Sequence, residues 1–198
     1  MCHAFLHDSN FYRLLFRIDE SLAEEVQKAG CPCVGVLHSA RYPRKPRGIR
    51  SALAGCCDSR LSFCCSADGC RRRRTPPSVR FLGRKVYLGV MVVLITALHH
   101  GLTPKRRRQL IEVLDIPPQT WSRWRRWWRE TFVQSRCWRS ESGRFMPPVD
   151  VGELPDSPLC RLAGNALPDR LCRLLVLMGP VTTNSSGYLR VAIDPQKM

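Results

Sequence analysis

The sequence predicts a mainly α-helical protein in which a small cysteine-rich module precedes a three-helix domain. Three observations lead to this prediction. Apolar residues recur at three- and four-residue spacing in several segments, which is the period of an amphipathic helix. Seven of the eleven cysteines lie within residues 31–70. Prolines and glycines then separate the later helical segments at short intervals, as expected for consecutive helices.

Net charge is the strongest signal in the composition. The 198 residues include 32 Lys and Arg against 16 Asp and Glu, a net charge of +16, and a hydrophobic content of 44% is sufficient for a core. A nucleic-acid partner accounts for this excess, because each neutralised phosphate releases counterions. An anionic membrane surface is the alternative. The sequence has no glycine-rich phosphate loop, Gly-x-Ser-x-Gly turn or His-Glu-x-x-His motif, so we expect no enzymatic activity.

Residues 1–30 are expected to contain an amphipathic helix over 11–29 that ends at Gly30. Its predicted apolar face consists of Leu14, Leu15, Ile18, Leu22 and Val26. Polar residues interrupt positions 1–16, so this segment lacks the continuous apolar core of a signal peptide. Together with an odd number of cysteines, which suits a reducing compartment, this indicates a cytoplasmic protein.

Residues 31–75 contain two cysteine pairs that can act together as metal ligands. The pairs are Cys31-Pro-Cys33 and Cys65-Ser-Ala-Asp-Gly-Cys70, and four thiolates satisfy tetrahedral Zn²⁺. A bound ion would also stabilise a module that is too small to fold on a hydrophobic core alone. We therefore predict a zinc-ribbon-like module with Zn²⁺ as its cofactor. The alternative ligands are His38, Cys57 and Cys64, and burial of the thiols without a metal is the other interpretation.

A basic loop that contains prolines lies between the two cysteine pairs, over residues 40–48. The prolines favour an extended chain, along which Arg44, Lys45 and Arg47 can contact a phosphate backbone. A solvated loop is the equally simple interpretation. After the module, the four arginines of residues 71–74 are followed by Pro76 and Pro77, and we interpret this segment as a hinge.

Three helices are predicted after the hinge, over residues 84–99, 104–114 and 119–135. The apolar run in the first of them is shorter than the ~20 residues that a membrane span needs, so we expect a buried helix and no membrane partner. Short connections at residues 101–104 and 115–118 join it to two amphipathic helices. This order is typical of a helix-turn-helix domain, which we place at residues 78–138.

Cations on the second and third of these helices are the predicted DNA contacts. In the third helix, the aromatic residues Trp121, Trp124, Trp128 and Phe132 fall on one face and are expected to be buried, which leaves arginines on the other face. Cations near the start of the second helix oppose its dipole and therefore favour a phosphate partner. The predicted contacts are Lys105, Arg106, Arg107, Arg108, Gln119, Thr120, Arg123, Arg126 and Arg129. A helix on a membrane surface and a calmodulin-type target are the alternatives.

Residues 139–198 are predicted to form one short helix followed by a flexible tail. The helix spans 168–178, with its apolar side made of Leu171, Leu174, Leu175 and Met178. Residues 179–198 are expected to be loop or a short hairpin. The acidic residues Asp115, Glu130, Asp150, Glu153 and Asp156 follow no strand pattern, so we do not expect the carboxylate triad of a DNA-cutting transposase.

Five segments taken together carry a resemblance to a known group of proteins. They are Cys31-Pro-Cys33 and residues 42–48, 65–73, 76–87 and 121–128. They resemble bacterial proteins encoded on or beside transposable elements, in which a zinc-ribbon-like segment precedes a helix-turn-helix. The resemblance covers residues 31–138 and implies a mobile-element setting, with a transposase or recombinase as protein partner. We therefore expect a non-catalytic accessory factor that binds double-stranded DNA; an RNA-binding or protein-bridging zinc ribbon is the alternative.

Overall fold

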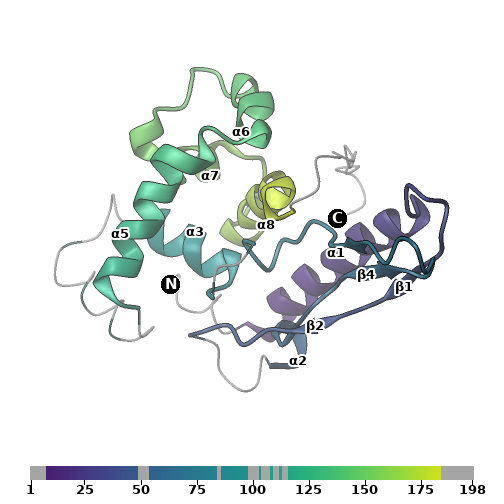
Figure 1. Cartoon of the computed structure of the whole chain (residues 1–198). Helices are drawn as coiled ribbons and strands as arrows, with labels where there is room; N and C mark the ends of the chain where they lie inside the picture. The colour runs from purple at the N-terminus through teal and green to yellow at the C-terminus, as the bar shows by residue number, and fades with distance from the viewer. Residues whose placement is uncertain are drawn as a thin grey trace.

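The protein is mainly helical and carries a small antiparallel sheet (Figure 1). The computed structural model describes residues 8–48, 54–83, 86–97 and 116–183, and the single residues 103, 108 and 112. The α-helices are α1 (Ser9–Lys28), α2 (Ala54–Cys57), α3 (Gly89–Ala97), α5 (Pro118–Arg126), α6 (Arg136–Glu141), α7 (Asp156–Arg161) and α8 (Leu167–Met178). The strands are β1 (Leu37–Ser39), β2 (Tyr42–Pro43), β3 (Ser59–Arg60), β4 (Phe63–Cys65) and β5 (Arg73–Arg74).

Helix α1 confirms the amphipathic helix predicted near the N-terminus. Asp8 caps it by accepting hydrogen bonds from the backbone N–H groups of Asn10 and Phe11, and Gly30 follows it with φ +66°. Its buried face includes Phe11, Tyr12, Leu15, Leu22 and Val26. The prediction that Leu14 lies on the apolar face was wrong, because Leu14 is 43% exposed. The buried stripe of the helix includes Tyr12 and Asp19 instead.

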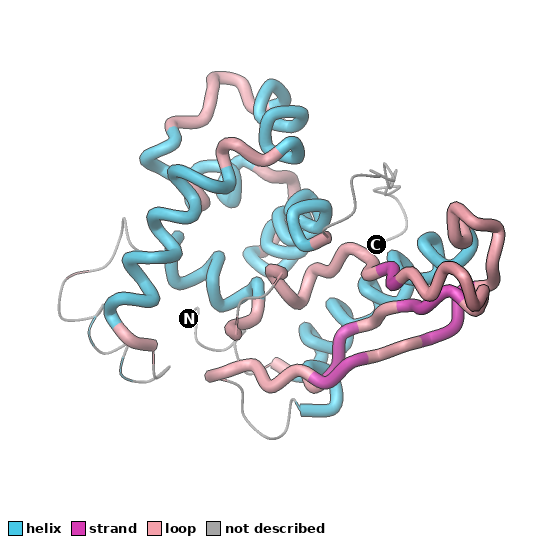
Figure 2. The backbone as a smooth tube through the Cα atoms, in the orientation of Figure 1, coloured by secondary structure: helices cyan, strands magenta, loops and turns pink. Residues whose placement is uncertain are grey.

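The strands form two antiparallel ladders, ordered β1-β4-β5 and β2-β3. Leu37 pairs with Cys65 in the first ladder and Tyr42 with Arg60 in the second, so both belong to one long hairpin (Figure 2). One face of the hairpin packs Leu37, Leu61 and Phe63 against Ala23 and Val26 of α1. This small hydrophobic cluster also holds the thiols of Cys31 and Cys65, so it borders the predicted metal ligands.

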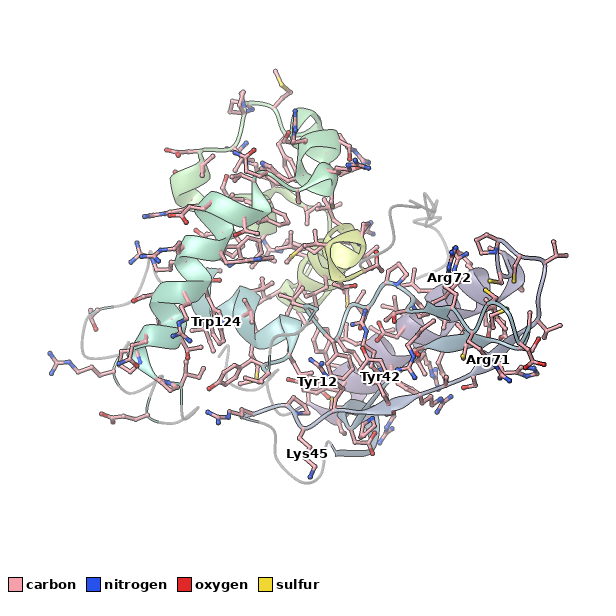
Figure 3. The ribbon with its side chains drawn as sticks, in the orientation of Figure 1. Tyr12, Tyr42, Lys45, Arg71, Arg72 and Trp124 are labelled. Carbon is pink, nitrogen blue, oxygen red and sulfur yellow. The ribbon has the colours of Figure 1, made fainter. Side chains whose placement is uncertain are left out.

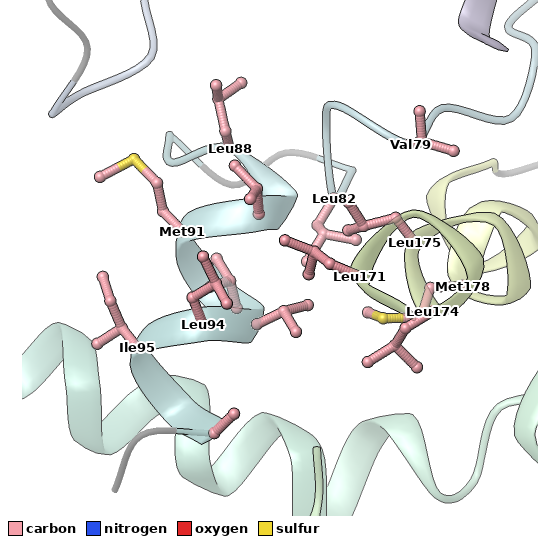
Figure 4. Close-up of a cluster of buried hydrophobic side chains, with 14 of the residues drawn as sticks. Val79, Leu82, Leu88, Met91, Leu94, Ile95, Leu171, Leu174, Leu175 and Met178 are labelled. Atoms are coloured by element: carbon pink, nitrogen blue, oxygen red, sulfur yellow. The ribbon is translucent and has the colours of Figure 1, made fainter. Parts of the chain in front are cut away.

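Helix α3 is the centre of the larger core. Every one of its residues is buried, as predicted, and α8 packs on it through Leu171, Leu174, Leu175 and Met178 (Figure 4). Among the described residues, no helix is both long and apolar enough to cross a membrane. Helix α8 confirms the predicted C-terminal helix, and it is a central element of the core rather than an appendage.

The predicted third helix of the three-helix domain is confirmed as α5 and its continuation. Trp121, Trp124, Trp128 and Phe132 are all buried, as the spacing predicts. The helix changes at residue 127 into a π-helical segment, η4 (Trp127–Phe132), which the sequence did not indicate. The indole N–H of Trp128 donates to the Thr96 hydroxyl at 2.9 Å, which connects η4 with α3.

The predicted second helix, residues 104–114, lies outside the described residues except at two positions. Arg108 and Glu112 are helical and exposed. The structure therefore contains the first and third helices of the predicted arrangement, and the helix-turn-helix remains a prediction. Residues 184–198 of the predicted tail also lie outside the described part, whereas residues 179–182 form a short 3-10 turn, η7 (Gly179–Thr182).

The segment predicted to be a hinge is held by buried hydrogen bonds. The guanidinium of Arg60 is buried and donates to the carbonyl oxygens of Pro76, Phe81 and Thr182 at 3.0, 3.0 and 3.1 Å. Helix α1 contributes residues to both the small cluster and the larger core. Residues 71–77 thus include strand β5 and a buried carbonyl group at Pro76, and the interpretation of this segment as a hinge stays a prediction.

Candidate functional site

The two cysteine pairs meet at one end of the sheet. The Sγ atoms of Cys31, Cys33, Cys65 and Cys70 all lie within 4.8 Å of one another. Two of the separations are shorter, 3.6 Å between Cys31 and Cys70 and 3.3 Å between Cys33 and Cys65. The structure thus brings together the four residues that the sequence predicted as ligands, and this group can hold a metal ion.

Two tight turns position the sulfurs. The first follows α1, where the backbone N–H of Val34 donates to the carbonyl of Cys31 at 2.8 Å. The second follows β4, where the N–H of Cys70 donates to the carbonyl of Ala67 at 2.9 Å. A hydrogen bond of 2.9 Å from Ser66 N–H to the carbonyl of Val36 joins the two turns. Each pair is therefore presented by a local turn, and the hairpin brings the turns together.

Gly35 is required by the packing of the sulfurs. A Cβ atom at this position would lie 2.5 Å from the Sγ of Cys65 and 3.2 Å from the Sγ of Cys33. Both distances are shorter than ordinary van der Waals contact, so any side chain here would push the sulfurs apart. The absence of a side chain at residue 35 is thus part of the geometry of the cluster.

The thiol of Cys65 resists ionisation when no cation is near. A hydrogen bond with the Ala67 backbone lowers the pKa of Cys65, but burial and hydrogen bonds shared with the other three thiols outweigh it and raise this pKa to about 12. A divalent cation reverses this balance, because coordination deprotonates the thiol outright.

The alternative ligands named from the sequence lie outside this group. Cys57 is buried in the larger core, and burial raises the pKa of its thiol to about 12. Cys64 and His38 pair with each other across β4 and β1, and they lie on the face of the hairpin opposite to Cys65. The alternation of a strand thus separates Cys64 from the cluster although it is adjacent to Cys65 in the sequence.

The predicted basic loop divides into structural and exposed cations. Arg44 donates to the carbonyl of Gly83 at 3.1 Å and its guanidinium lies 5.4 Å from the centre of the Phe81 ring. Arg44 thus holds the loop against the core, a role that the sequence did not indicate. Lys45 and Arg47 are exposed, as a phosphate contact requires.

On α5 and η4, most of the predicted contacts are exposed. The exposed residues are Gln119, Arg123, Arg126 and Arg129, while Thr120 is half-buried. Arg126 lies 3.9 Å from Glu130 in an exposed pair, which contributes little energy. Lys105, Arg106 and Arg107 lie outside the described residues. The burial of the tryptophans on the opposite side, among them Trp124, leaves this arginine face in solvent (Figure 3).

Sequence reasoning missed one group of cations as a surface. Residues 71–74, interpreted as part of a hinge, follow Cys70 directly, and the last two of them form β5 at the edge of the three-stranded sheet. Figure 3 shows Arg71 and Arg72 at the end of the sheet that lies away from α5. The signal in the sequence that could have identified this surface is the run of four arginines next to a predicted metal ligand.

Of the acidic residues considered for catalysis, Asp150 caps a turn by accepting from the N–H of Gly152 at 2.7 Å, and Asp115 lies outside the described residues.

No protein-family model, curated protein or solved structure matches this chain.

Proposed function

We propose that this protein is a non-catalytic, zinc-containing protein that binds double-stranded DNA. The observation that carries the proposal is the convergence of four cysteine sulfurs within 4.8 Å. Clustering of this kind is typical of structural metal sites in small modules, where the ion replaces a hydrophobic core.

The ligand set favours zinc. A tetrahedral ion with Zn–S bonds of about 2.3 Å separates its sulfurs by about 3.8 Å. The sulfurs here are 3.6 Å apart in Cys31 and Cys70, 3.3 Å apart in Cys33 and Cys65, and all within 4.8 Å. A site made only of sulfur disfavours magnesium and calcium, which prefer oxygen ligands. Four protein ligands also fill a tetrahedral ion, so no position is left for a reacting water. The zinc would therefore stabilise the module, which agrees with a non-catalytic role.

The positive charge supports DNA as the partner. The net charge is +16, and α5 exposes arginines on the side opposite its tryptophans. Gln119 lies in the first turn of α5, where a recognition helix meets base edges, and Arg123 lies in its last turn. Arginine can form two hydrogen bonds to guanine or bind phosphate, so this face can contribute both specificity and affinity.

A mobile-element setting is part of the proposal and depends only on the resemblance described above. In that setting the protein would be an accessory factor that recognises DNA for a transposase or recombinase. Preferential binding to the ends of a transposable element, compared with unrelated duplexes of equal length, is the measurement that tests it.

The proposal is tested with full-length protein purified without chelator. We expect about one zinc ion per chain, lost in Cys70→Ser and retained in Cys160→Ser, whose thiol is exposed and outside the cluster. We also expect duplex DNA binding that weakens steeply with salt. Absence of zinc from folded protein would refute the zinc site, and absence of salt-dependent duplex binding would refute the DNA function. Stronger binding to single-stranded RNA in competition would instead support the RNA-binding alternative.

A further inference from the structure

Three consecutive arginines form an exposed edge beside the cysteine cluster. We define the arginine edge as Arg71, Arg72 and Arg73, all of which are exposed. Arg73 pairs with Cys64 in the ladder, and β5 pairs with β4 alone among the described strands. The arginine edge therefore lies on the outer side of the sheet and faces solvent.

Internal contacts leave most of this charge available. The ion pair between Arg71 and Asp68 is exposed, with 66% and 92% of the two side chains accessible, so solvent weakens it. The side chain of Arg72 has no hydrogen bond or ion pair with any residue that the structure describes. The next arginine differs, because Arg74 donates to the carbonyl of Gly30 at 3.2 Å and is half-buried. The structure thus uses one arginine of the run internally and presents the other three outward.

The other charged residues of the cysteine-rich module do not neutralise them. Between residues 31 and 75, the described residues include nine Lys and Arg but only two acidic residues, Asp58 and Asp68. Charged residues on an edge strand also prevent pairing with another sheet. Strand β5 has only two residues, and this short length already limits pairing with another sheet. Protection of the sheet edge therefore does not explain why three arginines are adjacent here.

The geometry favours phosphate over bases as the ligand. A base-stacking surface needs an open aromatic ring, but Tyr42 is half-buried and the Arg73 guanidinium lies 5.9 Å from the centre of its ring. The planar guanidinium of arginine binds phosphate oxygens with two parallel hydrogen bonds. Contacts of this kind carry no base specificity, so they add affinity for any sequence.

We propose that the arginine edge is a second DNA-contacting surface, separate from α5, that binds the phosphate backbone of duplex DNA. The inference rests on the proposed DNA-binding function and assigns it a further site. The cysteine cluster positions this surface, because the edge begins immediately after Cys70 and the N–H of Cys65 donates to the carbonyl of Arg72 at 3.0 Å. Metal binding would thus hold the arginines in place for the phosphates.

The test compares Arg72→Gln/Arg73→Gln with wild-type zinc-loaded protein in duplex binding over a range of salt concentrations. Loss of two phosphate contacts should reduce the slope of log K against log salt by about 1.8. Between about 50 and 200 mM salt, the variant should therefore lose about tenfold less affinity than the wild-type protein loses. The reduction should be equal for specific and unrelated duplexes. Arg136→Gln/Arg139→Gln is the control, because it removes the same charge from exposed positions of α6, away from the sheet (Figure 1).

The outcomes separate this inference from the proposed function. If wild-type protein shows no salt-dependent duplex binding, both fail. If it binds and the variant keeps the wild-type slope, or the control loses as much, the arginine edge is not a phosphate surface although the proposed function stands. Loss of binding to vesicles of anionic lipid, with duplex binding unchanged, would identify a membrane surface instead. Unchanged zinc content and thermal unfolding of the variant establish that its fold is intact.

Discussion

The carboxylate of Asp19 accepts a hydrogen bond from Arg80 Nε at 2.8 Å, and 3% and 0% of the two side chains are exposed. The same carboxylate accepts from Ser78 Oγ at 2.6 Å and from the N–H of Val79 at 2.7 Å. Asp19 lies on α1, whereas its three donors follow the double proline. One acidic side chain therefore attaches the N-terminal helix to the segment that leads into the larger core.

Replacement of Asp19 by Asn is expected to lower the free energy of unfolding by about 3–5 kcal/mol, because Arg80 would remain as an unpaired buried charge. Chemical denaturation of the full chain measures this change. The control is Asp68→Asn, which removes an exposed ion pair and should change stability little. Equal effects from the two substitutions would contradict a structural role for the buried pair.

Gly35→Ala is expected to weaken metal binding, because the added Cβ would meet the Sγ of Cys65 at 2.5 Å. Overpacking of this kind typically costs about 1–3 kcal/mol, and competition with a chelator measures the loss of affinity. Gly69→Ala is the matched control, since a Cβ there has nothing within 4 Å and lies in the same module. Wild-type affinity in Gly35→Ala would show that the sulfurs can move without cost.

Val34→Gly is expected to stabilise the module by about 1 kcal/mol. Val34 has φ +66°, a conformation in which a β-branched side chain is strained, and its side chain is 93% exposed, so little packing is lost. Val36→Gly should have the opposite sign, because Val36 is also exposed but has no positive φ and glycine only adds entropy to the unfolded chain. The melting temperatures of the two zinc-loaded variants test the contrast, and a lower value for Val34→Gly would refute it.

Alkaline pH is expected to destabilise the folded protein through Cys137 and Cys172. Burial, reinforced by nearby carboxylates, raises the pKa of both thiols to about 11 from an ordinary value of 9.0. The folded state keeps them protonated whereas the unfolded state ionises them, so stability is complete below pH 9.0 and falls as the pH rises toward about 11. Melting temperatures across this interval should fall less steeply for Cys137→Ala/Cys172→Ala than for wild type. Identical slopes would exclude these thiols as the cause.

Elements with strong apolar periodicity were predictable from the sequence. The helix that ends at Gly30, the buried run of α3, the tryptophan face of α5 and the apolar side of α8 all agree with their spacing. The four cysteines were also predictable as a group, because each pair lies in its own turn. Leu14 was wrongly placed in the core, since spacing alone does not determine how a helix is rotated about its axis against its neighbours.

Other features depend on pairings between residues far apart in the chain. The buried partners of Arg60 and Asp19, the close approach of Gly35 to Cys65 and the position of the arginines at a sheet edge have no local pattern. The contacts of residues 71–77 were not predictable for this reason. Local composition showed charge and prolines, but not the strand and the buried carbonyls that they meet.

The sequence by itself determined that this protein is basic, mainly helical and equipped with four cysteines able to hold a metal ion, because charge, period and ligand spacing are local properties. Only the tertiary structure decided which of its cations are free to meet a partner. Arg44, Arg60 and Arg80 are used inside the fold, whereas Arg72 and Arg123 remain in solvent. The physical reason is that an arginine becomes structural when buried carbonyls or carboxylates lie within reach, and their positions depend on how distant segments pack.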